Sequence, residues 1–264
     1  MHITVLGAGA VGTAVAFDCA AHGHDVRVFD FEQFPDNIAR IADQGGIHAE
    51  GDISGFAPIA WSGHDIDEAL QDAELIYVVG PAYSTEPFGE AVAGKLSAGQ
   101  TVIVTPSSCG GALAFKRAAG LAVDDDSIRV AETSTLHYAV RLTEPGRVRV
   151  FLKLKAGNLL AALPGKHTDD ILILISDVYP SMEPGFLGIG AQPQLNHRYL
   201  NEDVGYGLMF MSKLGQQIGV ATPGIDAVIN VATIVMARDY RSEALRTPES
   251  LGIAGRSAEE LAAL

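Results

Sequence analysis

A glycine turn near the amino terminus constrains the fold more than any other feature of the sequence. Residues 7–12 read Gly-Ala-Gly-Ala-Val-Gly; they follow the apolar run His2–Leu6 and open the alanine-rich stretch Ala10–Ala21. The first run is typical of a buried strand, and the second predicts a helix. In the spacing G-x-G-x-x-G, the first glycine permits a tight turn and the second lets a pyrophosphate approach the backbone, while the third lets helix and strand pack closely. Free N–H groups at the helix start would bind the phosphates. The predicted dinucleotide-binding residues of this turn are Gly7, Gly9, Ala10, Val11 and Gly12.

An acidic residue, Asp30, follows the second predicted strand, Asp25–Phe29. A carboxylate at this position accepts hydrogen bonds from the adenosine ribose hydroxyls of a dinucleotide. It would repel a 2′-phosphate, Glu32 adds a second carboxylate, and the next basic residue is Arg40. The sequence therefore favours NAD over NADP as the cofactor.

Strands and helices alternate through the first half of the chain. Further strands are predicted at residues 75–79, 101–105 and 128–132, and further helices at 33–44, 65–72, 84–96 and 111–119. This order is typical of an α/β Rossmann fold, a doubly wound parallel sheet with helices on both faces. Ligands bind such sheets at the carboxyl ends of the strands. The residues following two of these strands, Pro81, Ala82 and Ser107, are therefore further cofactor-binding candidates.

The pattern changes after Ser134. Residues 136–141 and 147–155 alternate with the period of a strand around Glu144-Pro145-Gly146, which predicts a hairpin. One face of its second strand is apolar, and the other is basic: Arg147, Arg149, Lys153 and Lys155. The basic face either is solvated or attracts an anionic substrate. A strand at residues 159–163 and a helix at residues 168–178 follow.

Prolines and glycines concentrate in residues 179–194, and the chain beyond them has helical patterns. We place a domain boundary there. The prediction is a Rossmann dinucleotide-binding domain at residues 1–180 and a small all-helical domain for substrate binding and dimerisation at residues 181–264.

The composition excludes several classes of partner. With 18 basic and 32 acidic residues the net charge is −14, which argues against nucleic acid, since binding there depends on basic side chains. It also disfavours an anionic membrane surface, and we find no apolar run long enough to span a bilayer. Two cysteines, Cys19 and Cys109, make neither a disulfide framework nor a metal cluster. We expect a soluble cytoplasmic protein without a bound metal.

Several strings in the sequence resemble the opine dehydrogenase family, of the octopine and nopaline dehydrogenase type. They lie at residues 45–56, 78–83, 110–113, 131–136, 198–208, 222–223 and 238–240. The resemblance covers nearly the whole chain. It implies a Rossmann domain followed by a helical domain, and an enzyme that joins the amine of an amino acid to a 2-keto acid and reduces the imine with NAD(P)H.

The resemblance also implies roles for single residues. Asp203 would belong to a catalytic His–Asp pair, Arg198 would help to hold a substrate carboxylate, and Tyr206 in the same string is a substrate-binding candidate. The helical domain is shorter than in the family, and none of the eight histidines precedes a proline as the family's catalytic histidine does. His137 and His197 are alternative replacements. We interpret the other turn and surface histidines as structural and without partners: His22, His24, His48, His64 and His167.

One predicted helix, at residues 223–237, is apolar on nearly every side. Its polar residues Asp226, Asn230 and Thr233 form a narrow stripe, and a helix of this kind is mostly buried. The stripe either faces solvent or, through Asp226 and Asn230, contacts substrate. A helical domain this small cannot cover the apolar surface alone, so we predict a homodimer formed by these helices.

The leading hypothesis is an NAD(P)-dependent oxidoreductase acting on an imine or keto group of a small carboxylate substrate. An alternative is a protein that binds NAD(H) without turnover, as a sensor or scaffold. Another is a ketone reductase of the ketopantoate reductase type, although no lysine lies in a context typical of that catalyst.

Overall fold

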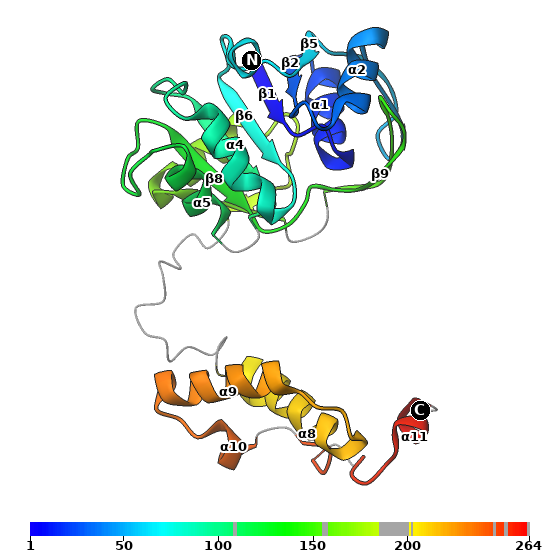
Figure 1. Cartoon of the computed structure of the whole chain (residues 1–264), viewed down its shortest axis with the longest axis vertical. Coiled ribbons are helices and arrows are strands. Elements are labelled where there is room, and N and C mark those ends of the chain that lie inside the picture. The colour runs from blue at the N-terminus through cyan, green and yellow to red at the C-terminus, as the bar shows by residue number, and fades with distance from the viewer. Residues whose placement is uncertain are drawn as a thin grey trace. The chain divides into compact units, whose positions relative to one another are not determined.

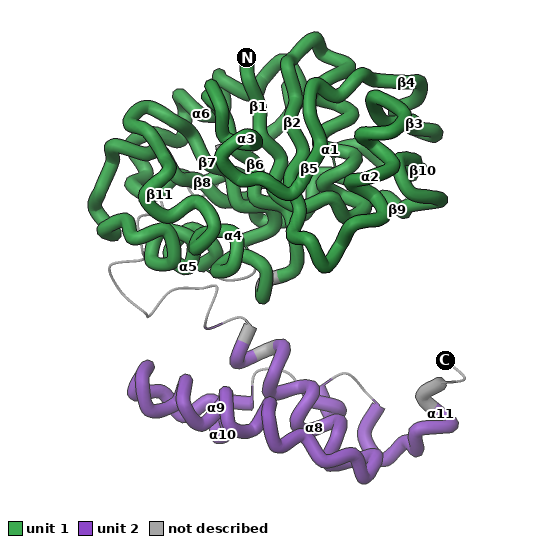
Figure 2. The backbone as a smooth tube through the Cα atoms, turned by 45° about the horizontal axis from the view of Figure 1, so that its top comes forward, with its two compact units in different colours: residues 1–188 green, residues 189–264 purple. Residues whose placement is uncertain are grey.

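The chain divides into two compact units, Met1–Gly188 and Ile189–Leu264, called unit 1 and unit 2 (Figure 2). The computed structural model describes residues 1–107, 110–154, 158–184, 201, 203–244, 247–250 and 253–262. The predicted boundary at residues 180 and 181 precedes the end of unit 1.

Unit 1 is built on an eight-stranded sheet of order β12-β11-β8-β7-β6-β1-β2-β5 (Figure 1). All its pairs are parallel except β8 with β11. The strand order reverses direction at β1, so the predicted doubly wound sheet is confirmed. Its strands are β1 His2–Leu6, β2 Asp25–Phe29, β5 Trp61–Gly63, β6 Leu75–Val79, β7 Thr101–Thr105, β8 Arg129–Thr133, β11 Leu159–Leu163 and β12 Glu183–Pro184.

Helices connect these strands, and several of them end earlier than the sequence pattern predicts, with the largest differences at α4 and α6. α4 ends at Val92, before Gly94, which has a φ of +71°. α6 ends at Leu174 rather than at residue 178. The helical segments of unit 1 are α1 Ala10–Ala21, α2 Pro35–Gln44, α3 Ile66–Leu70, η1 Ala82–Ser84, α4 Thr85–Val92, α5 Gly111–Ala118, η2 Gly165–His167 and α6 Thr168–Leu174.

A second sheet, of order β4-β3-β10-β9, packs against α1. Its strands are β3 Gly46–Gly51, β4 Gly55–Pro58, β9 Tyr138–Glu144 and β10 Arg147–Lys153. The predicted hairpin is therefore present as β9 and β10, whereas β3 and β4 were not predicted. α1 contacts strands of both sheets, and its residues 12–20 are all buried. This position explains why α1 needs apolar residues on every side.

A bulge in β10 changes the faces that the alternation predicts. The register with β9 shifts between Val150 and Leu152, so Phe151 and Leu152 are both exposed, at 59% and 47%. Lys153 turns away from the expected basic face and binds Asp18 of α1 instead. The predicted continuous basic face is thus wrong at Lys153, because a bulge reverses the side-chain alternation beyond it.

The Asp18 carboxylate is buried, with 2% of its side chain exposed. Lys153 Nζ lies 2.8 Å from one carboxylate oxygen and 3.1 Å from the other, and the Tyr138 hydroxyl donates to Asp18 over 2.6 Å. A buried charge is tolerated only when it is paired and hydrogen-bonded. This ion pair therefore joins the second sheet to α1.

Unit 2 is helical, with a small core of Val204, Met209, Ile229 and Tyr240. Its helical segments are a π-helical η3 Asp203–Leu208, α8 Met209–Ile218, α9 Pro223–Met236, α10 Tyr240–Glu243 and α11 Ala258–Ala262. The expectation that the helix beginning at Pro223 is mostly buried is wrong for the single chain. Its apolar residues are more than half exposed at four positions: Val228, Val231, Ile234 and Val235. Among the described residues, no helix has the length and apolar character needed to cross a membrane.

The ion pair between Asp18 and Lys153 leads to a prediction about stability. Lys153→Met leaves a buried carboxylate without its cation and should lower the free energy of unfolding by about 3 kcal/mol. The double variant Asp18→Asn/Lys153→Met should recover most of that loss, because neither charge remains. Urea unfolding of the three proteins measures both effects. Equal stability of Lys153→Met and the unchanged protein would show that the pair does not anchor the second sheet.

Candidate active site

The glycine turn between β1 and α1 is shaped by two close backbone contacts. Gly7 has a φ of +109°, and its N–H donates to the Phe29 carbonyl over 2.8 Å. A Cβ on Gly7 would lie 2.1 Å from the Val79 oxygen, and a Cβ on Gly12 would lie 1.8 Å from the Gly7 oxygen. The first and third glycines are therefore required by the packing of the chain itself.

Gly9, the second glycine, is different. It has an ordinary φ of −68° at the start of α1, where no side chain caps the helix, and a Cβ built on it would meet no atom within 4 Å. The fold therefore does not require glycine at this position. The open space beside Gly9 adjoins the first N–H groups of α1, which suits a pyrophosphate.

Asp30, directly after β2, stabilises the same turn through hydrogen bonds. Its side chain is buried and accepts hydrogen bonds from the Ala8 N–H over 2.7 Å and the Phe31 N–H over 2.8 Å. Burial raises the pKa of Asp30 above the ordinary aspartate value, although the two amides oppose this change. The carboxylate lies where the ribose of a dinucleotide would need an acceptor.

Asn37 of α2 also stabilises the glycine turn, and no sequence pattern had identified it as a residue of the site. Its Nδ2 donates to the Ala8 carbonyl over 2.5 Å and to Thr13 Oγ1 over 2.8 Å. Its Oδ1 accepts from the Gly146 N–H over 2.5 Å, at the turn between β9 and β10. One amide therefore fixes the glycine turn, α1 and the second sheet to each other. A polar residue on an exposed helix carries no signal of such a contact.

A cavity of about 300 Å³ lies at the carboxyl ends of β1, β6 and β7, and its walls are largely apolar. It brings together four predicted residues of the glycine turn with Pro81, and it adds Pro106 and Leu136, which the sequence analysis did not identify as site residues. The cavity is lined by Gly9, Ala10, Val11, Gly12, Val79, Gly80, Pro81, Pro106 and Leu136. Its position matches the strand ends at which doubly wound sheets bind ligands.

Ser107, Gly110 and Gly111 shape the start of α5. Ser107 Oγ accepts from the N–H groups of Gly110 and Gly111 over 3.2 Å and 3.3 Å, and Glu132 accepts from the Ala112 N–H over 2.8 Å. The Ser107 side chain therefore stabilises the helix start next to the cavity. Ala82 lies in η1, directly after Pro81.

His137 is completely buried in unit 1. Its Nδ1 is bonded to the Asn158 amide over 2.8 Å, and its Nε2 has no hydrogen-bond partner among the described residues. Burial lowers the pKa of His137 to about 3, so the imidazole is neutral at physiological pH. Its neighbour Leu136 lines the cavity, but His137 itself does not.

The remaining candidates belong to unit 2 by residue number. His197 and Arg198 fall outside the described residues, as does the side chain of Tyr206. Asp203 begins the π-helical segment η3, and its side chain is also outside the description. π-Helical turns are frequent at functional sites.

Asp226 is partly exposed and Asn230 is exposed, and both form hydrogen bonds within unit 2. Asp226 accepts from Ser212 Oγ over 2.7 Å, from Arg241 over 3.0 Å and from Thr222 Oγ1 over 3.1 Å. Hydrogen bonds from these side chains, Ser212 first, lower the pKa of Asp226. Arg241 also donates to Asn230 over 3.3 Å. Both residues therefore hold α8, α9 and α10 together.

The interpretation of the other histidines as partnerless is wrong for all five. The imidazoles of His22, His24 and His167 lie 3.4, 2.7 and 3.9 Å from Asp18, Asp177 and Asp126. His64 Nδ1 donates to the Asp30 carbonyl over 2.6 Å, and His48 lies 4.8 Å from the Phe56 ring. The described residues contain no group of three or more His, Cys, Asp or Glu side chains that could hold a metal ion.

Two family models match the chain. Residues 2–107 match the amino-terminal domain of NAD-dependent glycerol-3-phosphate dehydrogenase. Residues 175–236 match the α-helical domain of the NAD/NADP octopine/nopaline dehydrogenases. The opine dehydrogenase of Arthrobacter sp. (strain 1C) is 26% identical, over 96% of this chain and 96% of that protein. The alignment has 350 positions, whereas this chain has 264 residues. It therefore contains gaps at which the relative has residues that this chain lacks.

Solved structures show the same fold. An octopine dehydrogenase with NADH and L-arginine matches with a TM-score of 0.62 at 19% identity, over 82% of this chain and 54% of that chain. D-mandelate dehydrogenase with NADH matches with a TM-score of 0.56 at 15% identity, over 96% of this chain and 82% of that chain. The chain therefore spans about half the length of the octopine dehydrogenase structure.

The different surroundings of Gly9 and Gly12 allow a matched test of the dinucleotide site. Gly9→Ala places a methyl group in the open space and should leave the melting temperature unchanged while weakening NADH binding by at least about 10-fold, the equivalent of 1.4 kcal/mol. Gly12→Ala should destabilise the fold, because its Cβ meets the Gly7 oxygen. Calorimetry and thermal unfolding measure the two effects. NADH affinity that is unchanged in Gly9→Ala would place the pyrophosphate elsewhere.

The comparisons agree with the geometry of both units. The family model of the glycerol-3-phosphate dehydrogenase amino terminus covers the glycine turn, Asp30 and all the residues that line the cavity except Leu136. The octopine/nopaline dehydrogenase model covers α8 and α9. The predicted Rossmann fold is confirmed, and the match to an NAD-dependent amino-terminal domain supports NAD as the cofactor. The resemblance to the opine dehydrogenases is found again in the helical segment and in the alignment over nearly the whole chain, so the chain is similar to these enzymes in sequence and in fold.

Proposed function

We propose that this protein catalyses the NADH-dependent reductive condensation of an amine or amino acid with a 2-keto acid. The proposal rests on one observation. In a single chain, the glycine turn and its cavity precede a segment that matches the helical domain of octopine/nopaline dehydrogenases. The similar octopine dehydrogenase structures contain NADH with L-arginine, agmatine or pyruvate. An amine and a small 2-keto acid are therefore the substrate classes to test first.

The reaction has two stages that balance without a further reductant. The amine adds to the keto carbonyl and water leaves, which gives an imine. Bound NADH, held by the glycine turn and Asp30, would supply a hydride for the imine carbon, and the imine nitrogen gains a proton. The protein's contribution is orientation of the reactants. The apolar walls formed by Pro81, Pro106 and Leu136 exclude water from the hydride transfer.

Proton transfer requires a group near neutral pKa, for which a histidine paired with Asp203 is suited. His137 is a poor candidate because it is buried and its pKa is about 3. We therefore assign the proton-transfer role to His197, with Asp203 as its carboxylate. Arg198 binds the substrate carboxylate through two parallel hydrogen bonds, and Tyr206 contributes a hydroxyl to the substrate.

Asp226 and Asn230 are weaker candidates for substrate binding. Both accept hydrogen bonds from Arg241, so contact with a substrate requires displacement of this guanidinium. Their removal would also loosen the packing of α8, α9 and α10. Substrate kinetics of variants at these two positions therefore need a parallel measurement of stability.

The protein functions as a homodimer in this proposal. α9 buries Ile229 in the core of unit 2 and leaves Val228, Val231, Ile234 and Val235 more than half exposed. Contiguous exposed apolar residues mark association surfaces. We assign a second copy of α9 as the partner that covers this surface.

We also place the enzyme in the cytoplasm, because a free buried thiol, Cys19, suits a reducing compartment.

The α9 surface predicts the oligomeric state of a charged variant. Ile234→Glu is expected to convert a dimer into a monomer in sedimentation velocity, because a carboxylate would be buried without a partner in the interface. Ile173→Glu is the matched control, since Ile173 is also largely exposed but lies on α6 of unit 1. A monomeric unchanged protein would refute the dimer.

The activity itself is tested with NADH, pyruvate and a panel of amino acids, by following the absorbance of the reduced nicotinamide. NADH consumption should require both the amine and the keto acid. Asp203→Asn and His197→Ala should each lower kcat by about 100-fold, the usual range for loss of a general acid or base, with NADH affinity unchanged. Glu259→Gln, an exposed carboxylate on α11, serves as the control.

Two outcomes of this assay would contradict the proposed reaction. Consumption with the keto compound alone identifies a ketone reductase. Saturable NADH binding without consumption by any pair identifies a sensor or scaffold. Full activity of Asp203→Asn would show that the carboxylate has no part in proton transfer.

A further inference from the structure

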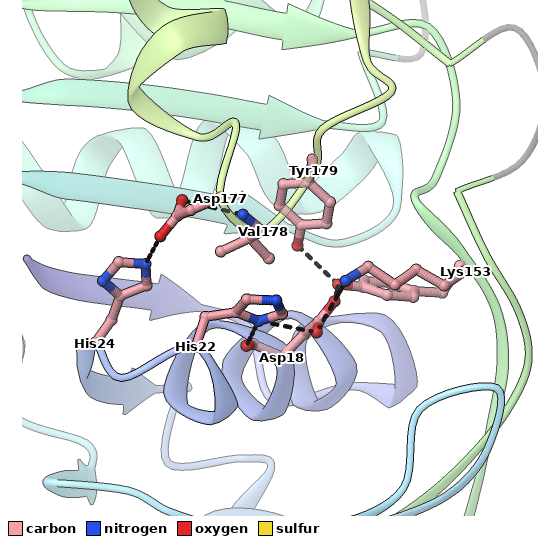
Figure 3. Close-up of polar contacts among 8 residues, drawn as sticks. Asp18, His22, His24, Lys153, Asp177, Val178 and Tyr179 are labelled. Atoms are coloured by element: carbon pink, nitrogen blue, oxygen red, sulfur yellow. Dashed lines mark hydrogen bonds and ion pairs between the residues drawn. The ribbon is translucent and has the colours of Figure 1, made fainter.

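A chain of buried polar groups connects α1 with the residues that follow α6 (Figure 3). It begins at Asp18 on α1, which accepts from Lys153 and from the Tyr138 hydroxyl. The Tyr138 hydroxyl lies 2.8 Å from the hydroxyl of Tyr179. All four side chains converge in the interior of unit 1 although they are far apart in sequence.

The direction of these hydrogen bonds follows from the number of hydrogens. A carboxylate only accepts, so Tyr138 donates its single hydrogen to Asp18. Tyr179 must then donate to the Tyr138 oxygen. Burial raises the pKa of both tyrosines well above the ordinary value, so both keep their hydrogens. Tyr179 is therefore the last donor of a chain that ends on the charge of Asp18.

A second link reaches the same segment. His24, in the turn after α1, lies 2.7 Å from the Asp177 carboxylate, whose other oxygen accepts from the Val178 N–H. The Lys153 ammonium also lies 5.8 Å from the centre of the Tyr179 ring. Residues 177–179 are thus held to α1 and to the turn behind it at two points.

Residues 177–179 lie shortly before the point where the chain leaves unit 1. After α6 and Tyr179 the chain passes through β12 and continues into unit 2 at residue 189. The other end of α1 starts in the glycine turn beside the cavity. One helix therefore carries both the dinucleotide amides and the anchor of the segment that leads to unit 2. Apolar residues would fill this space at no cost in desolvation, whereas a buried charge gives a single fixed arrangement.

We infer that Tyr179 is a positioning residue, which fixes the point where the chain leaves unit 1 to the helix that binds the cofactor. The inference rests on the proposed function, in which Arg198 and Asp203, beyond this exit point, act on the substrate. Loss of the tether should therefore impair the reaction of the substrates and leave cofactor binding intact.

The test compares Tyr179→Phe with Tyr77→Phe in the complete protein. Tyr77 is also fully buried, and its ring lies 6.3 Å from that of Tyr179, so it controls for removal of a hydroxyl in the same core. Tyr179→Phe should lower kcat/KM for the condensation about 10-fold, the upper range for one lost hydrogen bond. Its NADH dissociation constant should stay within about 2-fold of the unchanged protein. Tyr77→Phe should change neither quantity.

A second variant covers the case in which Tyr179→Phe does not fold. Asp177→Asn weakens the link to His24 at a partly exposed site, where Asp177 is 47% exposed, and should lower kcat/KM in the same direction. Unchanged kcat/KM in both variants, or a parallel loss of NADH binding, would overturn the inference. An unchanged protein that never consumes NADH would instead overturn the proposed function, and the inference with it.

Discussion

The close approach of α1 to β1 is the constraint on which the rest of unit 1 depends. Gly12 lies so near the Gly7 carbonyl that no side chain fits between them. This contact brings the start of α1 against the strand ends and leaves its first N–H groups facing open space at Gly9. Since α1 also supports the second sheet, its buried residues are small or apolar except at Thr13, which accepts from Asn37, and at Asp18, which binds Lys153.

Six elements of unit 1 were predicted with their observed bounds. β1, α1, β2, β6, β7 and β11 begin and end where the sequence pattern places them. The strands β3 and β4 were not predicted, because glycine, histidine and glutamate interrupt their short apolar runs. The bulge in β10 also left no signal, since it arises from pairing with β9. A local pattern cannot reveal a register that a distant strand imposes.

In the candidate site, too, the residues with local roles could be predicted and those brought in by the tertiary fold could not. Motif spacing identified the glycine turn and Asp30, whose roles are local to one βαβ unit. Asn37, Pro106 and Leu136 reach the site only through the tertiary fold, so no local sequence pattern identifies them. His137 shows the opposite error: its position after β8 suggested access to the site, yet packing against Tyr77 and Tyr179 buries it completely.

The central claim is that the amides at the start of α1 hold the pyrophosphate of NADH. A crystal structure of the complex tests it most directly. The account predicts pyrophosphate oxygens within hydrogen-bond distance of the N–H groups of Gly9, Ala10 and Val11, with ribose hydroxyls on the Asp30 carboxylate. A dinucleotide bound elsewhere, for example with its phosphates on the exposed arginines of the second sheet, would contradict it.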